Sequence, residues 1–275
     1  MSGDAGKSSG TDGGRGLSAV ILAAGKGTRM QSDLPKVCHP VGGRPMVCAV
    51  VDACFAAGCS RVVVVVGYQH EKVRDAVASG DPAGAVEFAM QEEQLGTGHA
   101  VRCAASAFDG VADEDAFVLC GDGPLIRSET LALMLDRHRS TGATATLATA
   151  TLDDPSGYGR VVRGVGGGFE RIVEQKNATD AELGINEVNP SYYCFDSSRL
   201  FSALERVEKN ELTGEYYVTD VPALLLADGD RVEVIDAVPA EDVLSINTPE
   251  HLAEVDRLYR ERVGGVGASA EGGAR

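Results

Sequence analysis

No hydrophobic run in this sequence is long enough to cross a membrane as a helix. The longest strongly apolar segment, Val62–Val66, is far shorter than the ~20 residues that a bilayer-spanning helix needs. Basic residues are also scarce: 25 Lys and Arg stand against 41 Asp and Glu, a formal net charge of -16. An acidic surface repels nucleic acid phosphates and anionic membranes at long range. We therefore expect neither nucleic acid nor membrane as a partner, and an acidic, soluble proteome explains the charge most simply.

Cysteine patterns typical of zinc sites and disulfide frameworks are missing. The seven cysteines are odd in number and include no Cys-x-x-Cys pair, and the five histidines lack metal-ligand spacing. These gaps exclude a zinc protein. Residues Met1–Gly16 are rich in Gly, Ser and Asp and contain no apolar core, so they do not resemble a secretory signal peptide. Buried free thiols in a reducing compartment fit best, and we expect a cytoplasmic protein.

The composition that remains is that of a globular chain, with 275 residues of which 44% are hydrophobic and 24% charged. A chain of this length buries a full core without disulfides or metals. Met1–Gly16 and Gly264–Arg275 are rich in Gly and are expected to be disordered tails, which leaves residues 17–263 as the folded part. We expect one large domain, or one domain with an inserted lobe.

Strand-like and helix-like segments alternate through the first half of the folded part. Leu17–Ala23 is a continuous apolar run that ends at a glycine loop, which is typical of a buried parallel strand. Similar reasoning predicts strands at Arg61–Val66, Ala85–Met90 and Ala116–Cys120, and helices at Pro45–Ala57, His70–Ala78, Thr97–Ala107 and Ser128–Arg139. This order predicts an α/β fold, Rossmann-like, with a mostly parallel sheet covered by helices on both faces.

After Thr141 the pattern changes to strands with few helices between them. The predicted strands are Ala143–Thr151, Gly159–Arg163, Phe169–Glu174, Glu187–Phe195 and Arg231–Val238. They predict a mixed-sheet lobe that completes one side of a cleft. A last helix begins at Thr248-Pro249-Glu250, with Thr248 as the N-cap and an ion pair between Asp256 and Arg260.

The loop after the first strand carries the first chemical signal. It runs from Leu22 to Met30 and contains Gly25-Lys26-Gly27-Thr28-Arg29. Ligands of open α/β sheets bind beyond the carboxyl ends of the strands, and glycines let backbone N–H groups approach phosphate oxygens. A P-loop is absent, and Met30 stands where the dinucleotide fingerprint needs a third Gly or Ala. Lys26, Arg29 and Lys36, with Arg44 close behind, predict the local basic cluster that a phosphate site in an acidic protein needs.

This loop, with Pro35-Lys36-Val37, resembles the signature of bacterial N-acetylglucosamine-1-phosphate uridyltransferases, also called UDP-N-acetylglucosamine pyrophosphorylases. Further matching segments follow in the family's order: Gln91 with Gln94–Ala100, Gly121–Ile126, Asp153–Arg160, Ile172–Glu174, Glu187–Asn189 and Gly214–Asp220. The resemblance covers nearly everything from Leu17 to about Val263. It implies a fold of the nucleotide-diphospho-sugar transferase type, with a nucleotide-binding half at about 17–140 and a sugar-binding half at about 141–263.

The resemblance also implies a reaction. UTP and N-acetylglucosamine 1-phosphate would give pyrophosphate and UDP-N-acetylglucosamine, a cell wall precursor, with Mg²⁺ as cofactor. A phosphate oxygen of the sugar phosphate would attack the α-phosphorus in line. Because this nucleophile is already an anion, catalysis needs positioning and charge neutralisation rather than a nucleophilic side chain.

Roles for individual residues follow from the same resemblance. Arg29, Lys36 and Asp122 would be catalytic, and Asp122 and Asn247 would bind Mg²⁺. Gly159, Glu174 and Asn189 would hold the sugar. The nucleotide would be bound by Leu22, Ala23, Ala24, Gly25, Gly27, Lys36, Gln91, Gly96, Thr97, Cys120 and Gly121. The segment Glu215–Asp220 is expected to lie behind the residues that contact substrate.

Four of these residues also have ordinary structural explanations. Thr97 could cap the helix that it begins, Asp122 could be a turn residue ahead of Pro124, and Asn247 could simply precede a helix cap. Glu174 could form a surface ion pair with Lys176.

Departures from the family pattern affect the expected sugar more than the reaction class. Cys120 stands where the family usually has tyrosine, and Gly123 replaces a bulkier apolar residue. Pro190-Ser191 follows Asn189 where the family has Thr-Gly. Many relatives continue into a left-handed β-helix that acetylates glucosamine 1-phosphate and builds a trimer. This sequence has a Gly-rich tail and no hexapeptide ladder there, so we expect neither property.

Two alternatives remain open. One is a nucleotidyltransferase for another sugar 1-phosphate, another nucleotide or a molybdenum-cofactor-like acceptor. The other, from a different class, is a catalytically silent, nucleotide-sensing subunit. Such a subunit is expected to lose charged site residues, whereas Arg29, Lys36, Asp122 and Asn247 are all present. Their presence favours an enzyme.

Overall fold

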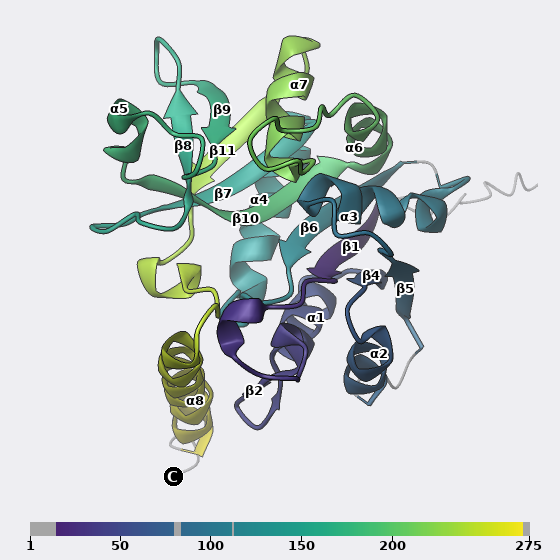
Figure 1. Cartoon of the computed structure of the whole chain (residues 1–275), viewed down its shortest axis with the longest axis vertical. Coiled ribbons are helices and arrows are strands. Elements are labelled where there is room, and N and C mark those ends of the chain that lie inside the picture. Colours follow the sequence, from purple (N-terminus) through teal and green to yellow (C-terminus); the bar gives the residue numbers. More distant parts are fainter. Residues whose placement is uncertain (1–14, 80–83, 112, 272–275) are drawn as a thin grey trace, which may run out of the picture.

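The computed structural model describes residues 15–79, 84–111 and 113–271, with side chains described as far as Gly264. At the centre of its sheet lies β1 (Gly16–Ala23), which pairs in parallel with β4 (Arg61–Val66) on one side and β6 (Glu114–Cys120) on the other. β5 (Val86–Met90) extends the parallel part beyond β4. The carboxyl ends of these strands therefore meet at one edge, as Figure 1 shows.

The sheet continues beyond β6 with mixed strand directions. β10 (Glu187–Asp196) runs antiparallel to both β6 and β7 (Ala145–Thr151), and β11 (Val232–Asp236) pairs in parallel with β7. The hairpin of β8 (Gly159–Arg163) and β9 (Phe169–Val173) attaches to the start of β10. The predicted α/β architecture with a mixed-sheet lobe is confirmed.

Helices cover both faces of the sheet because alternate strand residues face opposite sides. Ile21 and Val64 pack on the side that carries α1 (Met46–Ala56), α2 (His70–Ala78) and α4 (Ser128–Thr141). Val20 and Val63 pack on the side that carries α3 (Thr97–Cys103), α6 (Ser197–Leu204) and α7 (Val221–Ala227). The resulting two cores contain most of the buried apolar side chains of the described residues.

The remaining elements complete the fold. They are the two-stranded sheet of β2 (Pro40–Val41) and β3 (Arg44–Pro45), the short helix α5 (Asp180–Leu183), the final helix α8 (Pro249–Glu271) and several 3-10 turns. In α8, His251 N–H donates to the Thr248 hydroxyl at 3.3 Å and Arg260 pairs with Asp256, so the predicted cap and ion pair are confirmed. The sequence did not predict α5, α6 or α7.

Regular secondary structure extends into both segments that the sequence suggested as tails. Arg15 forms ion pairs with Asp115 and Asp196, and Gly16 already belongs to β1. At the other end, α8 continues past residue 264 to Glu271. Adding residues to an existing helix requires no new nucleation, so Gly-rich composition there lowers helix propensity without ending the helix. The remaining predicted tail residues, 1–14 and 272–275, lie outside the described part.

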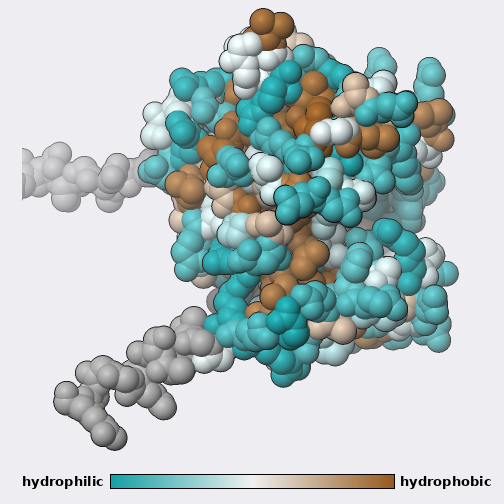
Figure 2. Space-filling view, turned by 90° about the vertical axis from the view of Figure 1, so that its left-hand side faces the viewer, coloured by the Kyte–Doolittle hydropathy of each residue, from teal (hydrophilic) through white to brown (hydrophobic). Residues whose placement is uncertain are grey.

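The surface agrees with the polar composition. Figure 2 shows a face on which hydrophilic residues predominate, with hydrophobic residues in smaller groups between them. Among the described helices, none has both the length and the apolar character that crossing a bilayer requires. All seven cysteines are free thiols, and five of them are buried, as predicted.

Candidate functional site

Three adjoining cavities form a cleft at the carboxyl edge of the parallel strands. Their volumes are about 340, 240 and 680 Å³, and Thr97 lines all three. Leu22 at the end of β1 and Cys120 at the end of β6 line the cleft from the sheet. This is the place where ligands of open α/β sheets bind. In the order of the volumes above, we call them the sugar-side, base and outer cavities; the first two names come from the sequence-based expectation for their lining residues and are labels only.

Polar side chains from three distant segments, three of them charged, converge at one end of the sugar-side cavity. Lys36 Nζ donates to the Asp122 carboxylate and, at 3.2 Å, to Asn247 Oδ1. Arg29 Nη2 donates to the same Asn247 oxygen at 2.8 Å. The Lys36 and Asp122 side chains are each only 17% exposed, so their ion pair is partly shielded from water. We call these four residues the ionic cluster.

Local backbone geometry explains this convergence. Gly27 has a φ of 66°, and a Cβ at this position would lie 2.5 Å from Lys36 Cβ, so the loop needs glycine to bring Lys36 in. Ile246 N–H donates to the Asp122 carbonyl at 3.0 Å, which fixes the segment before α8 against the turn after β6. Asp122 and Asn247 therefore lie together although 125 positions separate them.

The oxygens of Asp122 and Asn247 suit Mg²⁺, which takes one or two carboxylates from protein and completes its octahedron with phosphate oxygens and water. The Lys36 ammonium already lies between these oxygens, which shows that they can surround one cation. The described residues contain no group of three or more His, Cys, Asp or Glu that could hold a metal. Such a group is not required for an ion that is shared with a triphosphate.

The base cavity lies on the other side of Thr97. Gln91, 3% exposed, donates from Nε2 to the Gly96 carbonyl at 3.1 Å and lies 3.1 Å from His99 Nδ1. A Cβ on Gly96 would lie 2.5 Å from the Tyr216 carbonyl, so only glycine allows this close approach. The cavity is lined by Leu22, Ala24, Gly25, Gln91, Gln94, Gly96, Thr97, Ala100 and Glu215.

The structure changes the interpretation of Thr97. The N-cap of α3 is Gly96, so the predicted capping role of Thr97 is wrong. Thr97 Oγ1 instead accepts a hydrogen bond from Val218 N–H at 3.1 Å, because the chain of residues 215–218 crosses directly beside this turn. Gly98 N–H also donates to the Tyr216 carbonyl at 2.8 Å. These bonds join the two walls of the cleft.

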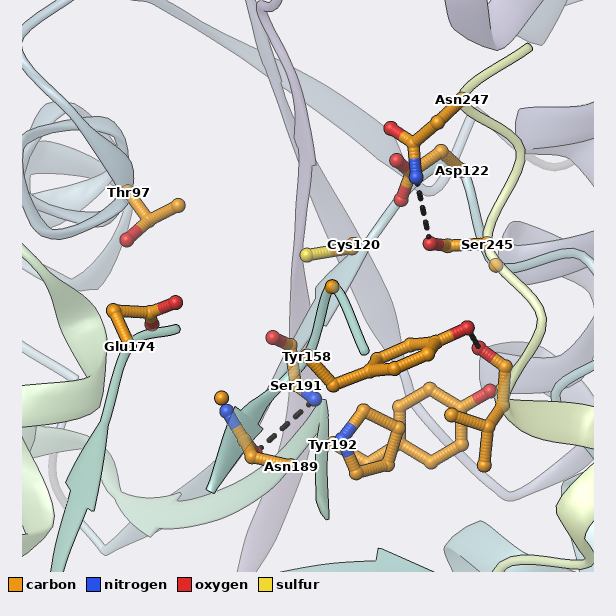
Figure 3. A pocket seen from close by; sticks show the side chains of 15 residues that line it. Thr97, Cys120, Asp122, Tyr158, Glu174, Asn189, Ser191, Tyr192, Ser245 and Asn247 are labelled. Carbon is orange, nitrogen blue, oxygen red and sulfur yellow. Dashed lines mark hydrogen bonds between the residues drawn. The ribbon is translucent and has the colours of Figure 1, made fainter. Parts of the chain in front are cut away.

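Gly159, Glu174 and Asn189 all line the sugar-side cavity, as Figure 3 shows for the last two. Glu174 Oε1 accepts from the Thr219 hydroxyl at 3.2 Å. Burial raises the pKa of Glu174, and the bond from Thr219 opposes this rise only in part. The hydrogen-bond partner of the Glu174 carboxylate in the described residues is Thr219, and no ion pair joins Glu174 to Lys176 there, so the alternative of such a pair is not supported. A Cβ on Gly159 would lie 3.2 Å from Ile172 Cγ2, so this wall is closely packed.

Asn189 is fixed by its neighbours on β10. Its Nδ2 donates to the Tyr193 hydroxyl at 2.6 Å, and its Oδ1 accepts from Ser191 N–H at 3.2 Å. Ser191 has a φ of 65°, in the left-handed region that favours glycine, at a register shift between Val188 and Tyr192. This geometry gives a physical reason for glycine at the equivalent family position.

Some predicted residues lie elsewhere. Ala23 and Gly121 are buried behind the cavity walls, where a Cβ on Gly121 would lie 3.0 Å from the Leu22 carbonyl. Lys26 Nζ lies 5.3 Å from the centre of the Tyr68 ring, and Arg44 pairs with Asp52 at 2.6 Å. The predicted four-residue basic cluster is therefore wrong, because Arg29 and Lys36 meet at Asn247 while the other two have different partners.

Sequence reasoning missed several lining residues. Tyr158 donates from its hydroxyl to the Val243 carbonyl at 3.3 Å, and Tyr192 donates to the Asp242 carbonyl at 3.2 Å. Tyr158 belongs to Asp153–Arg160, a segment that matches the family, so the sequence could have indicated Tyr158 as a lining residue. Glu215 lines both the base and outer cavities, which corrects the expectation that its segment lies behind the contact residues.

Burial changes the chemistry of one further lining residue. Cys120 is part of the wall of the sugar-side cavity and is labelled near the centre of Figure 3. Burial and the negative charge of Asp122 raise the pKa of its thiol to about 12. This cysteine therefore stays protonated at neutral pH and is a neutral wall residue rather than a nucleophile.

Residues 19–219 match the family model of the MobA-like NTP transferase domain, and the chain belongs to this family. Among curated proteins it is similar to the bifunctional protein GlmU of Geobacter metallireducens, with 47% identity over 247 residues, 90% of this chain and 51% of that protein. GlmU of Geobacillus thermodenitrificans is 45% identical over 245 residues, 89% of this chain and 52% of that protein. The chain thus spans about half the length of the curated relatives it matches.

A structural relative agrees on the fold. A crystal structure of UDP-glucose pyrophosphorylase complexed with UDP-glucose superposes with a TM-score of 0.69 at 18% identity, over 90% of this chain and 99% of that one. The predicted fold class is confirmed, and the GlmU proteins among the relatives agree with the resemblance that the sequence motifs indicated.

Proposed function

We propose that the chain transfers a uridylyl group from UTP to N-acetylglucosamine 1-phosphate, releasing pyrophosphate, with Mg²⁺ as cofactor. The observation that carries this proposal is the ionic cluster, because it combines two cations with two metal-type oxygens at one end of a cavity that Glu174 and Asn189 line. Similarity to GlmU proteins supports the choice of substrates. Residues of about 17–140 would bind the nucleotide and residues of about 141–263 the sugar.

The uracil would occupy the base cavity. Gln91 is buried and offers amide groups at the cavity wall, while Gly96 leaves room for a flat base. A wrong base would leave buried polar groups without partners, which can give large discrimination. The backbone of Ala24 and Gly25 would approach the phosphates from the end of β1.

The sugar phosphate would lie in the sugar-side cavity. Glu174 and Asn189 offer fixed acceptors and a donor for hydroxyl groups and an acetamido N–H. Glu174 is held by the hydroxyl of Thr219, and Asn189 is held by the hydroxyl of Tyr193 on the same strand. Such a preorganised wall holds the acceptor phosphate beside the ionic cluster, which raises its effective concentration at the α-phosphorus.

The chemistry then needs neutralisation of negative charge. Arg29 and Lys36 would bind the triphosphate and stabilise charge that develops on the departing pyrophosphate. When held by Asp122 and Asn247, Mg²⁺ would neutralise further phosphate charge. The acceptor phosphate is itself the nucleophile, so the protonated Cys120 thiol in the wall takes no part in bond formation.

We further propose small-molecule substrates as the partners, because the acidic surface repels nucleic acid and anionic lipid. We propose the cytoplasm as the location, because free thiols persist in a reducing compartment.

The experiment is pyrophosphate release across a panel of four nucleoside triphosphates and several sugar 1-phosphates. UTP should exceed CTP, GTP and ATP, and N-acetylglucosamine 1-phosphate should be the best acceptor. Comparable turnover with GTP, or a clear preference for glucose 1-phosphate, would sink the substrate assignment. UTP binding without any pyrophosphate release would instead favour a silent nucleotide-sensing subunit.

A further inference from the structure

The position of the Lys36 ammonium has a consequence for metal binding. Nζ donates to the Asp122 carboxylate and to Asn247 Oδ1 at 3.2 Å, the two oxygens that suit a divalent cation. Magnesium lies about 2.0–2.1 Å from its oxygen ligands. An ion bound to both of these oxygens would therefore occupy nearly the same space as Nζ. Lysine and metal exclude each other at this point.

Electrostatics favours the lysine when no nucleotide is present. The Lys36 and Asp122 side chains are each only 17% exposed, so water and salt screen their attraction less than they screen a surface ion pair. Arg29 adds a second positive charge at 2.8 Å from Asn247 Oδ1. A divalent ion that entered this place would have to displace Lys36 and would lie close to the positive charge of Arg29. Only one carboxylate, that of Asp122, would attract it.

A bound triphosphate reverses this balance. Its phosphates carry several negative charges, whereas Asp122 carries one, so Lys36 and Arg29 gain more by turning to the phosphates. Lysine is suited to such a movement because its charge sits on a flexible four-carbon stem. The oxygens of Asp122 and Asn247 would then be free to receive the ion.

We propose that Lys36 occupies the divalent-cation position of the nucleotide-free protein and gives it up only when a triphosphate binds. This inference rests on the proposed function in taking Asp122 and Asn247 as the metal ligands. It assigns Lys36 a second role besides phosphate binding: it excludes free divalent ions from the site, so that metal and nucleotide bind together.

The test measures Mn²⁺ binding to nucleotide-free protein by the loss of the free-ion signal in electron paramagnetic resonance. Lys36→Met should bind Mn²⁺ about tenfold more tightly than wild type, because an adjacent positive charge is removed. Lys72→Met is the matched control, since it makes the same change at an exposed lysine of α2 and should match wild type. Adding Asp122→Asn to Lys36→Met should abolish the gain and so place the ion at this site.

Equal Mn²⁺ affinity of Lys36→Met and Lys72→Met would overturn the inference, as would a gain that survives Asp122→Asn. Arg29→Met provides a second variant if Lys36→Met does not fold. It removes the other cation from Asn247 and should give a smaller gain, about threefold; no gain would again count against the inference. This binding assay needs no turnover. A tenfold gain combined with no pyrophosphate release in the substrate panel would therefore reject the proposed function and keep the inference.

Discussion

The two ends of the sugar-side cavity are built in different ways. At one end the ionic cluster consists of residues from loops and short 3-10 turns, and their side chains contact each other across 3.2 Å or less. At the other end Glu174 follows β9 and Asn189 lies on β10, where neutral hydroxyl partners hold both side chains. Loops allow charged groups to change partners during a reaction, whereas strands keep a shape constant. The ionic end is therefore suited to chemistry and the strand end to recognition.

This comparison is tested most strongly by Asp122→Asn, which keeps the shape of the side chain and removes its charge. If the ionic end performs the chemistry, turnover should fall on the order of 10³-fold, while Tm changes little. The measurement is turnover across a magnesium titration, with Asn247→Ala and the double variant beside it. Asn247→Ala should be milder, and the combined loss should be smaller than the sum because both act through one ion. Full activity of Asp122→Asn, or activity in excess chelator, would contradict a role for the metal.

Lys36→Ala should have the next largest effect. Loss of one positive group that stabilises phosphoryl charge costs about 2–4 kcal/mol of transition-state free energy, which would appear in kcat. Arg29→Ala should be similar, and Arg29→Lys should be tolerated only in part because the two-pronged guanidinium is lost. Steady-state kinetics in UTP checks this. Near-normal turnover of both alanine variants would mean that the ionic cluster does not bind the phosphates.

Glu174→Gln should change recognition and stability rather than kcat. We expect KM for the sugar phosphate to rise about tenfold, because a charged acceptor is replaced by a neutral one. Burial raises the pKa of Glu174 above its usual 4.5, so the folded protein binds this proton more readily than the unfolded chain. Ionisation of the wild-type residue therefore lowers stability as pH rises through the raised pKa.

Glutamine removes this titration, so Glu174→Gln should have a higher Tm than wild type at neutral pH. The difference should shrink as pH falls below 4.5, where Glu174 is neutral in both states. Thermal unfolding across this pH range is the measurement. A Tm difference independent of pH would show that burial of the charge is not its cause.

The smallest effect is expected at Ser191, where the strand end carries backbone strain. Its φ of 65° costs a residue with a Cβ about 1 kcal/mol, so Ser191→Gly should stabilise the fold by up to that amount. Ser191→Ala is the control, because it removes the hydroxyl and keeps the Cβ. Urea unfolding distinguishes the two variants. If both stabilise equally, the hydroxyl rather than the backbone is responsible.

The sequence predicted the sheet well because its strands carry strong local patterns. β4 is a run of β-branched residues, and α8 begins with a cap and a proline, so β4 and the start of α8 were predicted within a residue or two. α6 and α7 were missed because they have only eight and seven residues; α6 directly follows β10, and α7 directly follows the 3-10 turn Val218–Asp220. Asp196 caps α6 and Pro222 lies in the first turn of α7, but such signals are weak in short segments.

Site prediction had a different limit. The motifs identified Lys36, Asp122 and Asn247, but no spacing rule could show that Lys36 bridges the other two, because that contact depends on the sheet edge and the Ile246 backbone bond. The same limit explains why Arg44 was misplaced. Arg44 was assigned to the phosphate loop because it lies close to that loop in the sequence. In the fold it forms an ion pair with Asp52 on α1 instead.

The backbone bonds between the cleft walls restrict how the molecule can move. Gly98 is bonded to Tyr216 at one end of the cleft, and Ile246 is bonded to Asp122 at the other. A hinge motion that separated the walls would have to break both of these bonds. We therefore expect a rigid slot that ligands fill by diffusion. Its radius of gyration in X-ray scattering should barely change with UTP, and ligands should soak into its crystals without cracking them.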